Sequence, residues 1–143
     1  MSVWKSKLTA EEMQALARNT MVEHLGIRIL EIGDDYIKAG MPVDHRTRQP
    51  MGILHGGASV ALAETVGSFA AVMAAAPGSY CVGLEINANH IRSIKNGEVT
   101  GIAKPIHLGR TTQVWEIRIL DEEEKIVCIS RLTLAVLKKP GLK

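Results

Sequence analysis

A run of small and apolar residues from Ala58 to Ala76 places the strongest limit on how this chain folds. It has the length of one helix, and apolar side chains cover nearly its full circumference, which predicts a helix buried on all sides. Its polar residues are Ser59, Glu64, Thr65 and Ser68. A lone carboxylate at the centre of such a helix is costly to bury without a partner, so Glu64 is the first candidate for a functional residue.

The length of this run would also suit a membrane span. Glu64 at its centre argues against that, because a charge in the bilayer core is costly, and the glycines Gly57 and Gly67 also weaken the case. A helix with these features is more often the core helix of a soluble protein. We therefore predict a soluble protein with no membrane partner.

His55, Gly56 and Gly57 stand directly before the predicted helix. The glycine pair lets the backbone turn sharply and lets a ligand approach the first amides of the helix. Those amides have no partner inside the helix, and they favour an oxyanion or a polarised carbonyl. Donor amides, an imidazole and a buried carboxylate within one element form a candidate reaction site.

The 143 residues fit a single domain, 1–143, with a core of its own. The net charge of +2 is weak and no basic stripe is present, so nucleic acid is not an expected partner. Cys81 and Cys128 are isolated, which favours reduced thiols and leaves a disulfide open. No cluster has metal-ligand spacing, so no metal is predicted. The N-terminus lacks the apolar core of a signal peptide, which predicts a cytoplasmic protein.

Two short helices and six strands are predicted around the central run. Thr9 to Glu12 fit a capping box, opening a helix that buries Met13, Leu16 and Ala17. The predicted strands are Gly26–Ile32, Tyr36–Val43, Tyr80–Ile91, Glu98–Ile106, Thr111–Asp121 and Lys125–Leu137. Lys95–Gly97, Leu108–Arg110 and Glu122–Glu124 are predicted as tight connections between the last four strands. Short connections indicate an antiparallel sheet, and an α+β fold in which this sheet curls around the helix.

The run PMGILHGGASVALAETVGS, with MPVDHRTRQ before it and VGLEINANH after it, resembles the hotdog-fold acyl-CoA thioesterases. Within them it is similar to the branch of the 1,4-dihydroxy-2-naphthoyl-CoA thioesterase and the enterobactin-synthesis proofreading thioesterase. The resemblance covers about Trp4 to Leu137. It implies hydrolysis of aromatic acyl-CoA esters of the benzoyl or naphthoyl type, with medium-chain acyl-CoA esters as a further substrate class. It also implies a homo-oligomer, usually a tetramer built as a dimer of dimers, and no cofactor, because coenzyme A is part of the substrate.

The resemblance, together with the spacing of these residues, gives roles to five of them. Glu64 attacks the thioester carbonyl as a nucleophile or activates a water as general base, and the Gly56 amide polarises that carbonyl. Gln49 and His55 orient the thioester and its departing sulfur. Ser68, one turn after Glu64, can hydrogen-bond the carboxylate, the water or the acyl group.

Each of these residues also has a simpler interpretation. Glu64 can be a buried carboxylate held by hydrogen bonds, and Gly56 a residue needed only for a turn. Gln49 can be an ordinary loop residue and His55 a helix cap. Ser68 can bond back to its own helix.

Spacing also bears on how the site is assembled. Gly56 and Glu64 are eight positions apart, which is roughly 12 Å along a helix. A reacting carbonyl must lie about 3 Å from each group, so one chain cannot supply both. We therefore expect one subunit's Glu64 to face another subunit's Gly56.

The resemblance also implies a path for the pantetheine and nucleotide of coenzyme A. Its residues are Gly83, His90, Ile91, Arg92, Ser93, His107, Leu108, Gly109, Arg110, Thr111 and Thr112. Arg92 and Arg110 are suited to phosphate, although either can be an ordinary solvated charge. Met51 departs from the phenylalanine of the aromatic-acyl branch, and methionine adapts to several shapes.

Two other functions fit the same fold. A hotdog hydratase or dehydratase typically relies on a histidine and an acid arranged differently from these residues. A non-catalytic acyl-CoA-binding protein would not need Glu64, and sensors of that kind usually carry a DNA-binding segment. Release of free thiol from benzoyl-CoA separates the hydrolase from both.

Overall fold

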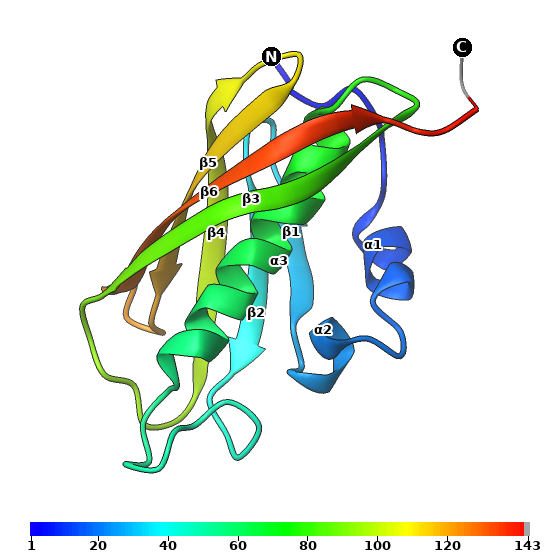
Figure 1. Cartoon of the computed structure of the whole chain (residues 1–143). Helices are drawn as coiled ribbons and strands as arrows, with labels where there is room; N and C mark the ends of the chain where they lie inside the picture. The colour runs from blue at the N-terminus through cyan, green and yellow to red at the C-terminus, as the bar shows by residue number, and fades with distance from the viewer. Residues whose placement is uncertain (142–143) are drawn as a thin grey trace.

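The fold is one long helix held inside a curved antiparallel sheet (Figure 1). The computed structural model describes residues 1–141. The helices are α1 (Ala10–Leu16), α2 (Met21–His24) and α3 (Gly56–Ala74). The strands are β1 (Arg28–Ile32), β2 (Ile37–Pro42), β3 (Ser79–His90), β4 (Glu98–Leu108), β5 (Thr112–Leu120) and β6 (Ile126–Lys138). The predicted α+β arrangement, with the sheet curled around a central helix, is confirmed.

The sheet has the order β1-β2-β4-β5-β6-β3, so the predicted pairing of β3 with β4 is wrong. Lys95–Gly97 was expected to join two adjacent strands, but β3 pairs with β6 and β4 pairs with β2 and β5. The connection between β3 and β4 therefore crosses the sheet. Its consequence is that β3 forms an edge with an unpaired row of backbone groups.

The core lies between α3 and the concave face of the sheet. Trp115, Ile117 and Ile119 share the inner face of β5 and are fully buried, as their alternation predicts. Leu62 and Val66 of α3 are buried in the same cluster. Burying side chains of this size stabilises the fold by about 1.5–3 kcal/mol each.

The helix α3 differs from its prediction in two respects. It begins at Gly56 and ends at Ala74, two residues before the predicted limits at each end. It is also not buried on all sides in the single chain. A stripe along it is half-buried or exposed and comprises Gly57, Val60, Ala61, Glu64, Thr65, Ser68, Phe69 and Val72. These positions follow helical spacing on one face, which the sheet of the same chain leaves uncovered.

The N-terminal segment packs against this core. Thr9 and Glu12 form the predicted capping box, and Met13 and Ala17 are buried. Leu16 was expected to be buried but is 65% exposed, because it lies on the outer side of α1. The thiols of Cys81 and Cys128 are free.

Candidate active site

The first turn of α3 presents one backbone donor without a partner. His55 caps the helix with its Nδ1, which accepts a hydrogen bond from the Gly57 N–H at 2.7 Å. The N–H groups of Ala58 and Ser59 donate to the His55 carbonyl. Within residues 1–141 the Gly56 N–H has no acceptor. The capping interpretation of His55 is confirmed, and its effect is to leave the Gly56 amide as the available donor at a positive helix end.

The imidazole of His90 lies directly over Gly56. A β-carbon added at position 56 would be 2.8 Å from His90 Nε2, so any larger residue there would require the imidazole to move. Beside them is a cavity of about 240 Å³, which we call the Gly56 pocket. It is lined by Gln49, Ile53, Leu54, Gly56, Ser59, His90, Ile91, Arg92, Ser93 and Val127. The predicted residues Gln49, Gly56 and His90–Ser93 are therefore brought together.

Gln49 enters this pocket from a loop held by its own polar contacts. The Gln49 Oε1 accepts a hydrogen bond from the Met51 N–H, and the Gln49 N–H donates to the Ile53 carbonyl at 2.8 Å. The side-chain NH₂ of Gln49 has no hydrogen-bond acceptor within residues 1–141. Gln49 is thus both a loop residue and a possible donor toward a ligand.

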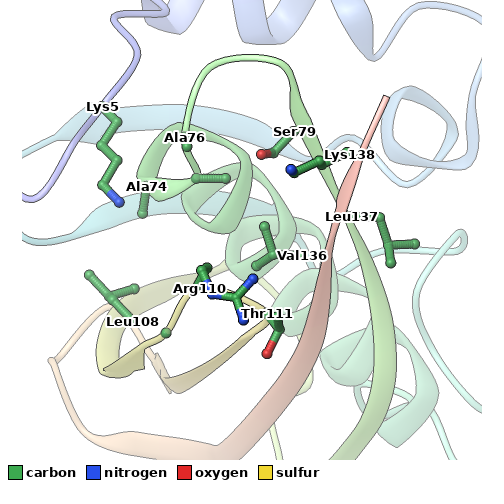
Figure 2. A pocket seen from close by; sticks show the side chains of 12 residues that line it. Lys5, Ala74, Ala76, Ser79, Leu108, Arg110, Thr111, Val136, Leu137 and Lys138 are labelled. Atoms are coloured by element: carbon green, nitrogen blue, oxygen red, sulfur yellow. The ribbon is translucent and has the colours of Figure 1, made fainter. Parts of the chain in front are cut away.

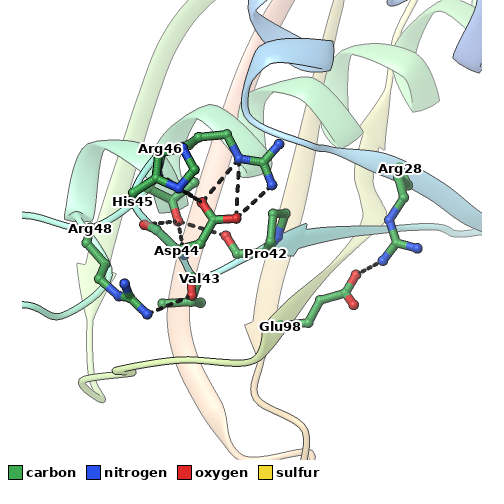
Figure 3. Close-up of polar contacts among 9 residues, drawn as sticks. Arg28, Pro42, Val43, Asp44, His45, Arg46, Arg48 and Glu98 are labelled. Carbon is green, nitrogen blue, oxygen red and sulfur yellow. Dashed lines mark hydrogen bonds and ion pairs between the residues drawn. The ribbon is translucent and has the colours of Figure 1, made fainter.

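The loop before Gln49 is held by charged side chains (Figure 3). Arg46 donates to both carboxylate oxygens of Asp44, and this hydrogen bonding lowers the pKa of Asp44 to about 2. Arg48 donates to the carbonyls of Lys95 and Val43. Asp44 is therefore ionised at neutral pH, and the loop is tied to the β3–β4 connection.

Glu64 lies away from the Gly56 pocket, in the middle of α3. Its side chain is half-buried and is directed at Gly83 on the edge strand β3, where an added β-carbon would be 2.6 Å from Oε1. Within residues 1–141 its carboxylate has no ion-pair partner, and no hydrogen bond joins it to Ser68. Gly83 is thus next to the carboxylate rather than in a pocket with His90.

The other predicted coenzyme A residues lie at the opposite end of α3 (Figure 2). A cavity of about 480 Å³, which we call the Arg110 pocket, has Leu108, Gly109, Arg110 and Thr111 in its wall. The remaining lining residues are Lys5, Ala74, Ala75, Ala76, Ser79, Val136, Leu137 and Lys138. His107 and Thr112 flank this wall without lining it; the Thr112 carbonyl accepts from the Gly109 N–H at 2.9 Å. The predicted path is therefore split between the two ends of the helix.

Arg92 and Arg110 differ in their surroundings. Arg92 Nε lies 3.9 Å from Asp121 Oδ2, so a nearby carboxylate already balances its charge. Arg110 has no carboxylate within ion-pair distance among the described residues. Arg110 is consequently the better placed of the two for an external anion.

Several residues that line these pockets were not predicted from the sequence. Ser59, which is 2% exposed, lines the Gly56 pocket from the first turn of α3, and its spacing of three from Gly56 could have indicated this. Lys5 and Lys138 line the Arg110 pocket from the two ends of the chain, and no local pattern indicates that. Among residues 1–141 no group of three His, Cys, Asp or Glu side chains could hold a metal ion.

Comparison with known proteins agrees with this fold and these motifs. The thioesterase superfamily matches residues 51–128. The 1,4-dihydroxy-2-naphthoyl-CoA hydrolase of Escherichia coli is 53% identical over 135 residues, covering 94% of this chain and 99% of that protein. The proofreading thioesterase EntH of Cronobacter sakazakii is 51% identical over 94% of this chain and 98% of that protein.

A solved structure extends the same comparison. A Haemophilus influenzae thioesterase superposes with a TM-score of 0.94 at 52% identity, covering 98% of this chain and 99% of that chain. The superposition therefore includes the central helix and the whole sheet. The chain belongs to the thioesterase superfamily and is a hotdog-fold thioester hydrolase.

Proposed function

We propose that this enzyme hydrolyses aromatic acyl-CoA esters of the benzoyl or naphthoyl type, and medium-chain acyl-CoA esters, to the free acid and coenzyme A. The observation that carries the proposal is that α3 has two polar groups without a bonding partner. The Gly56 N–H lacks an acceptor and the Glu64 carboxylate lacks an ion-pair partner, within the described residues. The N–H is suited to donate to the carbonyl oxygen of a thioester, and the carboxylate is suited to act on its carbonyl carbon or on a water.

Glu64 can act in two ways. As a nucleophile, its carboxylate adds to the thioester carbon, the thiolate of coenzyme A leaves, and water then hydrolyses the resulting anhydride. As a general base, it takes a proton from a water that adds to the same carbon, and the thiolate leaves after that. In both cases the oxygen of the tetrahedral intermediate accepts a hydrogen bond from the Gly56 N–H.

The two groups must come from different subunits. Glu64 lies eight residues after Gly56 in the same helix, which is roughly 12 Å along its axis. The uncovered stripe of α3 and the unpaired edge of β3 adjoin each other, and Val82 and Leu84 on that strand are exposed. A second copy placed across this surface would cover the stripe and pair with the edge strand. We propose such a dimer as the functional unit and, by resemblance to the family, a tetramer of two dimers.

The acyl group is proposed from the relatives. The hydrolase of Escherichia coli acts on a naphthoyl-CoA ester, as its name states. Met51, at the position that departs from the phenylalanine of that branch, is 82% exposed in the single chain. A flexible thioether there accommodates aromatic and medium-chain aliphatic groups alike.

Thiol release from benzoyl-CoA tests the proposal. The wild-type enzyme should release free thiol, and Glu64→Gln should lower kcat by roughly a hundredfold or more because it removes both nucleophile and base. Glu11→Gln is the matched control: Glu11 is an exposed acid on α1, outside both pockets and the proposed dimer surface, and its neutralisation should leave the rate unchanged. Full activity in Glu64→Gln, with normal unfolding temperature, would contradict the role of this residue. A panel of aromatic, aliphatic and carrier-protein thioesters then ranks the acyl groups.

A further inference from the structure

Two buried hydroxyl groups of this chain lack a hydrogen-bond partner. Among residues 1–141 the buried polar side chains are Thr47, Ser59, Gln113 and Ser130. The Thr47 hydroxyl donates to the Pro42 carbonyl at 2.7 Å, and the Gln113 amide donates to a backbone carbonyl of α3 at 3.3 Å. Ser59 and Ser130 are each 2% exposed, and neither hydroxyl bonds to another described residue. Ser59 lines the Gly56 pocket, whereas Ser130 lines neither pocket of the candidate site.

The packing of α3 does not explain the Ser59 hydroxyl. A serine or threonine inside a helix can donate to the carbonyl four residues before it, and Thr65 does so with the Ala61 carbonyl at 2.7 Å. The Ser59 hydroxyl makes no such bond to the His55 carbonyl, which accepts from the Ser59 N–H at 3.2 Å. Burying a hydroxyl without a partner costs free energy, and α3 has alanine at other buried positions. A ligand that bonds to the hydroxyl would remove this cost.

Helical geometry brings the Ser59 hydroxyl to the side of the free Gly56 amide. Ser59 follows Gly56 by three positions, and residues with this spacing lie on one face of a helix. Side chains of a helix lean toward its N-terminus, so this hydroxyl lies over the first turn of α3. Both residues line the same cavity of about 240 Å³. An oxygen that accepts from the Gly56 N–H at about 2.9 Å is therefore within reach of the Ser59 hydroxyl as well.

The surroundings of these two donors favour negative charge on such an oxygen. The imidazole of His90 covers Gly56, and Ile53 and Val127 contribute apolar side chains to the wall. The charged residue among those that line the pocket is Arg92, and no aspartate or glutamate lines it to oppose an oxyanion. Donors with preset positions in a partly apolar site stabilise developing charge more strongly than water does.

We propose that the Ser59 hydroxyl is a second donor to the thioester carbonyl oxygen and forms an oxyanion hole together with the Gly56 N–H. When a nucleophile adds to the carbonyl carbon, the π electrons of the carbonyl move to its oxygen, and both donors bond to the resulting oxyanion. When the thiolate leaves, the carbonyl double bond forms again and Ser59 has kept its proton. The inference rests on the proposed role of Gly56, and it makes Ser59 a catalytic residue because the hydroxyl contacts a reacting atom.

His90 is the alternative partner of this hydroxyl. The imidazole lies over Gly56, so a bond from Ser59 to the ring would orient the ring instead of the substrate. The pH dependence of the Ser59 contribution separates the two roles. A contribution made through an imidazole changes between about pH 5 and 8, where imidazoles titrate, whereas a direct bond from a hydroxyl does not depend on pH in this range.

Steady-state hydrolysis of benzoyl-CoA tests the proposal. Ser59→Ala should lower kcat roughly tenfold or more at each pH and leave KM nearly unchanged, because the lost bond is strongest in the transition state. Ser59→Cys keeps the size of the side chain but has a weak donor, so it should lose activity to a similar extent. Ser130→Ala is the matched control, because it removes an equally buried and unbonded hydroxyl that lines neither pocket, and its kcat should equal that of the wild type.

Three outcomes of these kinetics would overturn the proposal. They are equal losses in Ser59→Ala and Ser130→Ala, wild-type kcat in Ser59→Cys, and a loss in Ser59→Ala that varies with pH. The last of these would assign Ser59 to the orientation of His90.

The infrared carbonyl band of bound substrate gives a second measurement, which does not depend on turnover. In the Glu64→Gln variant, benzoyl-CoA with an isotopic label at its carbonyl carbon should show a lower C=O frequency when bound, because the donors polarise this bond. Adding Ser59→Ala should reverse part of that shift, and adding Ser130→Ala should reverse none. A band that Gly56→Pro moves and Ser59→Ala does not would defeat this inference alone. Absence of thiol release from benzoyl-CoA by the wild type would instead defeat the proposed function.

Discussion

The Glu64 carboxylate lies against the backbone of Gly83, so closely that a β-carbon added at position 83 would be 2.6 Å from Oε1. Glu64 belongs to the central helix and Gly83 to the edge strand β3, where the β3–β6 register shifts between Gly83 and Glu85. The carboxylate can therefore occupy this position because residue 83 has no side chain.

Gly83→Ala should displace this carboxylate while leaving the fold intact, because the far end of a flexible side chain can rotate away from a methyl group. We expect kcat to fall about tenfold and the unfolding temperature to stay within a few degrees of the wild type. A double-mutant cycle provides the control. In the Glu64→Gln background the Gly83→Ala change should have no further effect, and a full additional loss would show that Gly83 acts elsewhere.

Gly56→Pro removes the one free amide of the first turn. Proline is favoured at the first position of a helix, and His55 before it has the extended conformation that proline requires, with φ −69° and ψ 131°. Loss of this donor should lower kcat by roughly a hundredfold. Gly56→Ala is the matched control, since both substitutions place a β-carbon near His90 but only proline lacks the N–H. Similar losses of kcat in the two variants would show that the β-carbon near His90, rather than the missing N–H, causes the effect.

Mixing two inactive variants tests whether a site is shared between subunits. In a mixed dimer of Gly56→Pro and Glu64→Gln chains, one site contains both changes and the other contains neither. Co-refolding equal amounts should restore roughly a quarter of the wild-type rate, because half of the dimers are mixed and each has one intact site. No recovery, or full activity in a sedimenting monomer, would place both groups in one chain.

Asp121→Asn should strengthen any contact between Arg92 and a phosphate. Arg92 Nε lies 3.9 Å from Asp121 Oδ2, and the carboxylate competes with an incoming anion. Asp121 Oδ1 accepts hydrogen bonds from the backbone N–H groups of Glu123 and Lys125, and the side-chain oxygen of asparagine can accept both in its place. KM for benzoyl-CoA should fall about twofold, and Arg92→Ala should raise it by a similar factor without changing kcat. The reverse order of KM values would show that Arg92 has only a structural role.

Local patterns were sufficient to predict most elements of this fold. The apolar run predicts α3, the capping box at Thr9 and Glu12 predicts α1, and alternation places Trp115, Ile117 and Ile119 on one buried face. These features depend on residues a few positions apart, so the sequence alone determines them. The same holds for the glycine pair and imidazole at the start of α3, whose chemistry depends on a helix end.

Only the tertiary structure decided which distant residues meet. The pairing of β3 with β6 rather than β4 depends on competition among all strands for neighbours, and hydrophobic alternation is the same for either partner. That pairing leaves β3 at an edge, brings Gly83 to Glu64, and leaves one stripe of α3 uncovered although its composition indicated complete burial. Lys5 reaches the Arg110 pocket because Trp4 stacks on Trp115 and Met73 offers a free carbonyl. Such contacts join residues far apart in the chain, and their energy exists only once the sheet has closed around the helix.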